Sequence, residues 1–184
     1  MNKYIISAIL ATSGIACTNN PPAVTASTDT RAESPAKTES TLPDTASVQK
    51  WITGVIEGFL NSEISNARRD SMINSLTKDY QEFKQDALNV EYDNGDSTIT
   101  EEKFKKKWQH KYNTDRAGEG GYFISAQDNG KCKVTTCQWL RNTQDASFYK
   151  VVIEDVDNNL SYHRDIKVIH QNGKLLIDDI LEYD

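Results

Sequence analysis

The spacing of apolar residues changes once along this chain, from a helical period to a strand period, and that change limits the folds it can adopt. Between Val48 and Leu60, apolar residues recur at three- and four-residue intervals, which predicts an amphipathic helix behind a Ser47 cap. From Gly120 onward, apolar residues tend to alternate with polar ones, as they do in half-buried strands. The order predicts an α+β domain whose helices precede its sheet.

Two further helices follow from shorter patterns. One is predicted over Arg68–Leu76, with Tyr80 and Phe83 packing beyond it. The other begins at a capping-box pattern, Thr98–Glu101, in which threonine and glutamate satisfy two N-terminal amides. Its aromatic residues, spaced four apart, share one face: Phe104, Trp108 and Tyr112.

The alternating half of the chain predicts five strands, at Tyr122–Gln127, about Thr135–Arg141, Ser147–Asp155, Leu160–His170 and Lys174–Leu181. Turn-forming residues stand near the gaps, at Asn129-Gly130, Asp157–Asn159 and Asn172-Gly173. Short connections make neighbouring strands antiparallel. The predicted fold is therefore α+β, with about three N-terminal helices packed on one face of a curved antiparallel sheet of about five strands.

Residues 1–16 have the pattern of an export signal. Lys3 supplies a positive charge, Tyr4–Ala11 is apolar, and small residues follow. The stretch Gly14–Cys17 (GIAC) resembles a bacterial lipobox, in which the cysteine is acylated and becomes the mature N-terminus. Cleavage by ordinary signal peptidase and retention as an uncleaved cytosolic chain are the alternatives. The resemblance implies a lipid attached to Cys17.

Residues 17–47 join this cysteine to the domain, which is predicted to span 48–184. All four prolines of the chain lie in this segment, among many threonine, serine and alanine residues. It cannot bury enough apolar surface to offset the entropy lost on ordering, so we expect a flexible linker with a reach of about 30 Å. Thr18 stands where an inner-membrane retention signal has aspartate. The resemblance therefore implies a bacterial cell-envelope protein, anchored in the outer membrane and facing the periplasm.

Two local patterns also resemble a known family. Ala126–Asp128 (AQD) follows an apolar run after the third predicted helix, and Gly173–Ile180 (GKLLIDDI) lies in the last apolar run. With the helix-first order, they resemble the DUF3828-type branch of the NTF2-like superfamily, which occurs in many bacterial lipoproteins. The resemblance covers about residues 48–184 and implies a cystatin-like cone. Leu175 stands where this family usually has an aromatic residue.

The NTF2-like resemblance directs attention to residues that could line a pocket between sheet and helices. Related enzymes, such as ketosteroid isomerase and scytalone dehydratase, place an acid or base there, where burial shifts its pKa. The candidates in this chain are Trp108, Tyr112, Tyr122, Tyr149, His163 and His170. None belongs to a catalytic motif, so we expect them to form core or pocket wall.

Metal, cofactor and nucleic-acid sites find little support in the sequence. The three histidines lack metal-ligand spacing, and no C-x-x-C occurs. The stretch Asp155–Asn159 loosely resembles a calcium loop but lacks its glycine and closing glutamate. The net charge is −6, and the lysine run from 103 to 111 follows Glu101 and Glu102, which favours a solvated helix face over phosphate binding. We expect no metal, no cofactor and no nucleic acid.

Three functions remain open at this point. The first is a non-catalytic envelope lipoprotein whose domain binds an envelope protein or a small apolar ligand. The second is a small-molecule isomerase, dehydratase or hydrolase of the NTF2-like type. The third is an immunity protein that blocks a toxin. An open cup with an isolated carboxylate or histidine on its floor would favour the enzyme over the binding protein.

Cys132 and Cys137 are the two cysteines left once Cys17 carries a lipid. An oxidising compartment favours a disulfide between them. On one straight strand, however, their Cα atoms would lie about 16 Å apart, whereas a disulfide needs less than about 7 Å. Their odd spacing would also point the side chains to opposite faces. The bond requires a bend at Lys133–Thr136, and both outcomes stay open.

Overall fold

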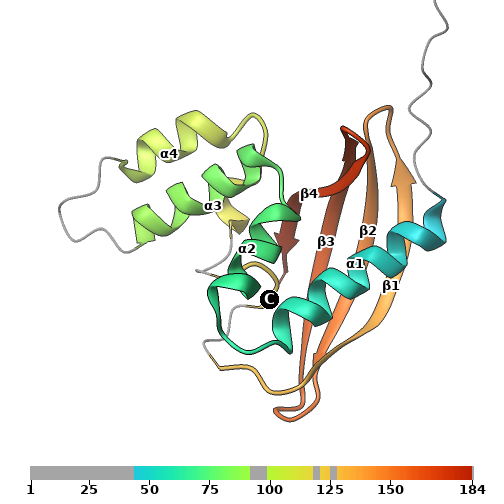
Figure 1. The fold of residues 1–184 in the computed structure, drawn as a ribbon. Helices are drawn as coiled ribbons and strands as arrows, with labels where there is room; N and C mark the ends of the chain where they lie inside the picture. The colour runs from blue at the N-terminus through green and yellow to red at the C-terminus, as the bar shows by residue number, and fades with distance from the viewer. Residues whose placement is uncertain (1–43, 92–98, 118–120, 125–127, 184) are drawn as a thin grey trace, which may run out of the picture. The chain divides into compact units, whose positions relative to one another are not determined.

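The computed structural model describes residues 44–91, 99–117, 121–124 and 128–183. Over these residues, four α-helices and a short 3₁₀ helix precede four strands (Figure 1). The helices are α1 (Thr45–Leu60), α2 (Asn66–Asn74), α3 (Lys78–Glu91), α4 (Glu101–Trp108) and η1 (Thr114–Arg116). The strands are β1 (Cys132–Asn142), β2 (Ala146–Asp155), β3 (Leu160–Gln171) and β4 (Lys174–Glu182). The predicted export signal, Cys17 and the linker as far as residue 43 lie outside the described residues.

The sheet is an antiparallel meander in the order β1-β2-β3-β4. Asn172 and Gly173 turn the chain from β3 into β4, and their φ angles of 53° and 75° suit asparagine and glycine. The β2–β3 turn is held by the Asp155 carboxylate, which accepts hydrogen bonds from the backbone N–H groups of Gly130 and Asn158. The predicted α+β class and antiparallel sheet are confirmed, with four strands described.

Helix α1 crosses one face of the sheet (Figure 1) and packs against β1. Four residues of the predicted apolar stripe are buried, Val48, Ile52, Ile56 and Leu60. The other three, Trp51, Val55 and Phe59, are only half-buried, which corrects the expectation that the whole stripe is core. Each of the four buried side chains stabilises the fold by about 1.5–3 kcal/mol when it leaves water. Facing residues of β2 and β3, such as Val151, Ile153 and Ile166, are also fully buried. The core therefore lies between α1 and the face of the sheet that α1 covers.

Polar side chains of α1 and its C-terminal cap cover the outer edge of β1. Asn61 exchanges two hydrogen bonds with the backbone of Cys132, both 2.8 Å long. The Glu57 carboxylate accepts a hydrogen bond from the Val134 N–H at 2.9 Å. On the opposite edge, the backbone of Ile177 pairs with the turn between α2 and α3. Because unpaired edge groups can pair with other chains, these contacts close much of both edges.

Helices α3 and α4 hold an aromatic cluster beside β4. Phe83 is central, with ring centroids 4.6 Å from Tyr112, 5.5 Å from Phe104 and 5.8 Å from Trp108. Tyr80 contacts both Phe83 and Tyr112. Such ring pairs add to the energy of area burial, so the cluster fixes α4 on α3.

The lysines of α4 are paired with nearby carboxylates. Lys107 lies 2.6 Å from Glu82 and 2.7 Å from Asp86, both on α3. Lys105 lies 2.9 Å from Glu101, one turn earlier on α4. The basic run is therefore largely balanced by neighbouring acids and forms the solvated helix face that the sequence indicates.

The ends of two helices differ from the prediction. Helix α1 begins at Thr45, because Asp44 is the cap: its carboxylate accepts hydrogen bonds from the N–H and the hydroxyl of Ser47. Helix α4 begins behind Thr100, whose side chain accepts a hydrogen bond from the Lys103 N–H. The predicted capping residue, Thr98, lies outside the described residues.

Two elements are wrong in the sequence prediction. Helix α3 is missed, because charged residues separate its buried side chains. The predicted strand Tyr122–Gln127 is not a strand over residues 122–124, and residues 125–127 lie outside the described residues. Phe123 and Ile124 are both buried, so this segment turns two consecutive side chains into the core instead of alternating.

The structure decides the disulfide that the sequence leaves open: Cys132 and Cys137 are separate thiols on β1. The strand continues through both residues, so the bend that a bond requires does not occur. A register shift between Val134 and Thr136 inserts one extra residue. The two cysteines therefore face residues of β2 on the same side, Asp155 and Val151, which corrects the expectation of opposite faces.

Candidate functional site

The aromatic residues proposed for a pocket do not converge on one cavity. Trp108 and Tyr112 contact each other, with ring centroids 5.6 Å apart, but inside the cluster around Phe83. Tyr149 is buried on β2 opposite Ile166. None of these three side chains lines either described cavity.

Two further candidates, Tyr122 and His170, lie in other parts of the fold. Tyr122 is half-buried, with its ring edge against Phe59 of α1. His170 is half-buried near the end of β3, opposite Leu175. Neither residue joins the α3–α4 aromatic cluster, and the sixth candidate, His163, lines a separate hollow, so the candidates form no common pocket.

The buried phenols have raised pKa values. Burial raises the pKa of Tyr112 to about 12, with a smaller contribution from the negative charge of Asp178. Burial also raises the pKa of Tyr122 and Tyr149. These hydroxyl groups therefore stay protonated near neutral pH, which suits packing and hydrogen bonding better than proton abstraction.

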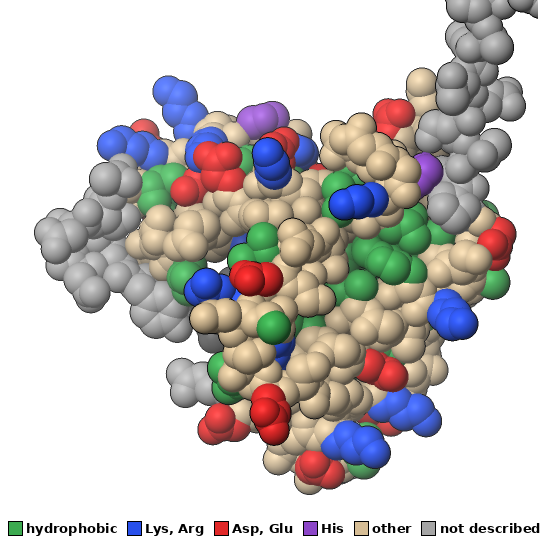
Figure 2. Space-filling model, in the orientation of Figure 1, with side chains coloured by type: hydrophobic (Ala, Val, Ile, Leu, Met, Phe, Trp, Pro, Cys, Tyr) green, Lys and Arg blue, Asp and Glu red, His purple; other side chains and the backbone are tan. Residues whose placement is uncertain are grey.

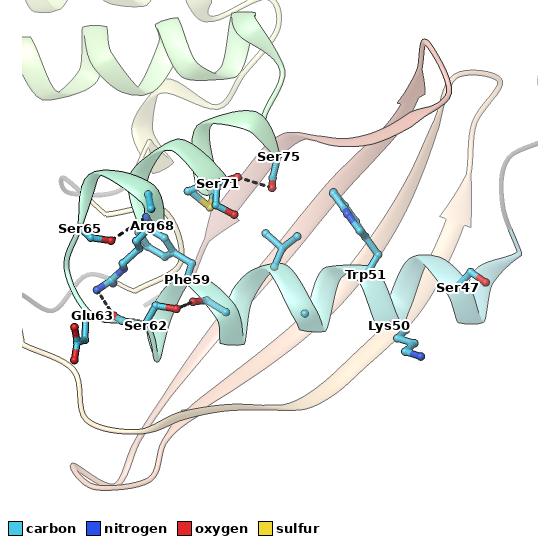
Figure 3. Close-up of a pocket in the computed structure, with 15 residues that line it drawn as sticks. Ser47, Lys50, Trp51, Phe59, Ser62, Glu63, Ser65, Arg68, Ser71 and Ser75 are labelled. Carbon is cyan, nitrogen blue, oxygen red and sulfur yellow. Dashed lines mark hydrogen bonds between the residues drawn. The ribbon is translucent and has the colours of Figure 1, made fainter.

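A groove of about 1010 Å³ lies between α1 and α2 (Figure 3). Its apolar lining includes Trp51, Val55, Phe59 and Met72. In the space-filling view, hydrophobic side chains gather above the N-terminal half of α1 (Figure 2). The groove is open and partly apolar, and its size is in the range of pockets that bind ligands.

Two helix-interior glycines, Gly54 and Gly58, also line the groove. A Cβ atom added at either position would meet nothing within 4 Å among the described residues. Neither glycine therefore serves a tight turn or a close contact in this part of the chain. Glycine inside a helix costs about 1 kcal/mol of helix stability relative to alanine. Gly54 and Gly58 therefore destabilise α1, and they leave its outer face without a side chain at two positions.

The polar groups around the groove are held by local hydrogen bonds. Arg68 lies over the Phe59 ring, 4.4 Å from its centroid, and donates a hydrogen bond to the Ser62 carbonyl. The Ser65 hydroxyl caps α2, and the Ser75 hydroxyl donates to the Ser71 carbonyl. Figure 3 shows these bonds within α2 and the loop that precedes it. They hold the α2 wall of the groove in place, which lowers the entropy cost of binding.

A second, smaller hollow of about 450 Å³ lies on the outer face of the sheet. It is lined by Leu140, Lys150, His163, Asp165 and Tyr183, among others. The Tyr183 hydroxyl donates a hydrogen bond to Asp165 at 2.9 Å. His163 therefore lies on the face of the sheet opposite α1, away from the other pocket candidates.

A buried ion network is the main polar feature that the sequence analysis misses. Arg164 of β3 and Glu182 of β4 pair across the sheet, with Nη2 and Oε2 3.4 Å apart and side chains 0% and 4% exposed. Lys84 of α3 lies 3.5 Å from the same carboxylate and also donates to the Ala117 carbonyl. The sequence offers one signal for this network. Side chains alternate between the two faces of β3, so Arg164 shares a face with the buried Tyr162 and Ile166.

Asp179 is a second polar residue that sequence reasoning misses. Burial, together with the negative charge of Asp178, raises its pKa to about 6. Asp178 itself is buried and binds the Thr77 hydroxyl and the Lys167 ammonium, at 2.9 and 2.7 Å. The hydrogen bond between Asp178 and Thr77 fixes β4 against the turn before α3. Asp179 does not line either described cavity.

No group of three or more histidine, cysteine, aspartate or glutamate side chains is placed to hold a metal ion among the described residues. The stretch that resembles a calcium loop is instead a hairpin turn, in which Asp155 and Asp157 accept hydrogen bonds from backbone N–H groups. Within the same part of the chain, no helix is long and apolar enough to cross a membrane.

The residues behind the family resemblance fall in different parts of the fold. Gly173–Ile180 forms the last turn and most of β4, so its apolar residues are explained by the sheet. In the other pattern, only Asp128 lies within the described residues. The resemblance remains a prediction. No family model, no curated protein and no solved structure matches this chain.

Proposed function

We propose that this protein is a lipid-anchored lipoprotein of the bacterial cell envelope whose NTF2-like domain binds a partner protein without catalysis. One observation carries the proposal: the α1–α2 groove, with two glycines on its floor that the described domain leaves uncovered. A protein gives up helix stability in this way where another surface must approach closely. The groove's apolar lining and fixed α2 wall suit a protein helix, which would lie along α1.

The proposed location in the cell envelope rests on the sequence. The export pattern of residues 1–16 and the lipobox-like GIAC stretch support acylation of Cys17. Two or more acyl chains would supply stable anchoring. The linker would then hold the domain near the outer membrane, facing the periplasm, where a partner in the envelope can reach the groove.

The enzyme alternative finds less support in the described residues. It needs an acid or base on the floor of an open cup, whereas Trp108, Tyr112 and Tyr149 pack into the core. Nothing in the fold favours the immunity alternative over other protein partners, because both use a binding surface. The groove therefore supports the binding function best.

A photo-crosslinking experiment tests this function. A photoreactive phenylalanine analogue replaces Trp51, which lines the groove, in the full-length chain in its own cells. The matched control places the same analogue at Trp139, which is 42% exposed on β1 and does not line the groove. We expect a discrete protein adduct from position 51 and not from position 139. No adduct at position 51, or the same adducts from both positions, would refute the groove as the binding surface.

A further inference from the structure

The outer face of α1 is shaped for close contact with another helix. Gly54 and Gly58 lie one turn apart on this face, and nothing described lies within 4 Å of their missing side chains. The distance between two packed helices depends on the side chains at their contact. Two glycines at this spacing let a second helix approach α1 more closely than any larger residue would allow.

Charged residues flank the glycine pair on both sides. Lys50 stands four residues before Gly54, and Glu63 stands five residues after Gly58. Both line the groove and are exposed; Lys50 lies in the first half of α1 and Glu63 in the loop after its C-terminal end (Figure 3). Arg68 also lines the groove, but it is half-buried over the Phe59 ring and donates a hydrogen bond to the Ser62 carbonyl. The exposed charges of this face are therefore positive at Lys50 and negative at Glu63, with the glycine pair between them.

This arrangement is complementary to itself. In a two-fold dimer, residue i of one copy meets residue j of the other, and the reverse contact also forms. If two α1 helices cross antiparallel at residue 56, Gly54 meets the second copy's Gly58, and Lys50 comes beside the second copy's Glu63. A parallel crossing would instead bring like charges together, which costs several kcal/mol at an interface.

We propose that the groove's partner is a second copy of this chain, bound through an antiparallel contact between the two α1 helices. The proposal rests on the function proposed above and names the partner of that site. Lipid anchors on both copies would confine them to one membrane surface and raise their effective concentration. A contact of modest affinity would then suffice for dimers in the envelope.

Charge reversal tests this contact in the full-length chain, extracted in mild detergent and measured by size-exclusion chromatography with light scattering. We expect the wild-type chain to dimerise. Lys50→Glu and Glu63→Lys should each weaken dimerisation at least about tenfold, because each places two like-charged pairs at the contact. The double variant should restore it. Lys106→Glu, an exposed lysine of α4 outside the groove, is the matched control and should change nothing.

Other outcomes overturn the proposal. A wild-type chain that stays monomeric, or a double variant as weak as either single one, excludes this dimer. Gly58→Leu gives an independent check, because a larger side chain should block the contact while the domain stays folded by circular dichroism; a dimer that survives it also excludes the contact. If the chain is monomeric but position 51 crosslinks to a different protein, the self-association fails while the groove's binding function stands.

Discussion

Glu182→Gln is expected to cost about 3–5 kcal/mol of unfolding free energy. The Glu182 carboxylate lies between two buried cations, Arg164 and Lys84. Removing one partner of a buried ion pair leaves a desolvated charge without its counter-charge, which is strongly destabilising. Glutamine keeps the shape of the side chain, so the loss would report charge rather than packing.

Urea unfolding followed by circular dichroism measures this loss. Glu154→Gln is the matched control, because Glu154 is exposed on β2 and should change stability by less than about 0.5 kcal/mol. In a Lys84→Met background, the same change at Glu182 should cost less, since one of the two cations is gone. A loss under about 1 kcal/mol in the wild-type background would show that the network does not hold β3, β4 and α3 together.

Cys17→Ala is expected to move nearly all of the protein from the membrane fraction to the soluble exported fraction. The cysteine thiol is the proposed attachment point of the lipid, and alanine cannot be acylated there. Each buried methylene of an acyl chain contributes about 0.8 kcal/mol of membrane binding, so losing all of them should abolish anchoring.

Fractionation of cells with and without detergent, followed by immunoblotting, measures the redistribution. Thr18→Ala, the neighbouring residue, is the control and should stay in the membrane fraction. Recovery of Cys17→Ala in the membrane pellet, released only by detergent, would mean that the anchor lies elsewhere and that the lipobox interpretation is wrong.

The elements that the sequence predicts well are those whose signal is local. The apolar stripe of α1 needs only its own spacing, and the Asn172-Gly173 turn needs only backbone angles that favour these two residues. Helix α3 carries a usable signal too, since Tyr80, Phe83, Ala87 and Val90 recur at helical intervals. The many charged residues between these four make the helical spacing hard to recognise in the sequence. The segment at 122–124 fails because its burial is decided by distant contacts with α1.

The candidate site depends on information that no local pattern contains. Gly54 and Gly58 become informative only when the fold shows that nothing packs on them. The ion network joins Lys84 to Glu182, 98 positions away in the sequence, through a strand register that the sequence does not specify. Trp108 and Tyr112 are plausible pocket residues by type, but burial in the α3–α4 cluster decides their role.

We infer that α1 keeps two glycines for a partner and not for its own folding. The most direct test measures both properties of one variant, Gly54→Ala/Gly58→Ala, in the full-length chain. We predict that its unfolding free energy in dilute solution rises by about 1–2 kcal/mol, because alanine is the better helix former and each Cβ has open space. We also predict that the adduct from position 51 is lost or strongly reduced. A fall in unfolding free energy, or an adduct of unchanged yield, would contradict the claim.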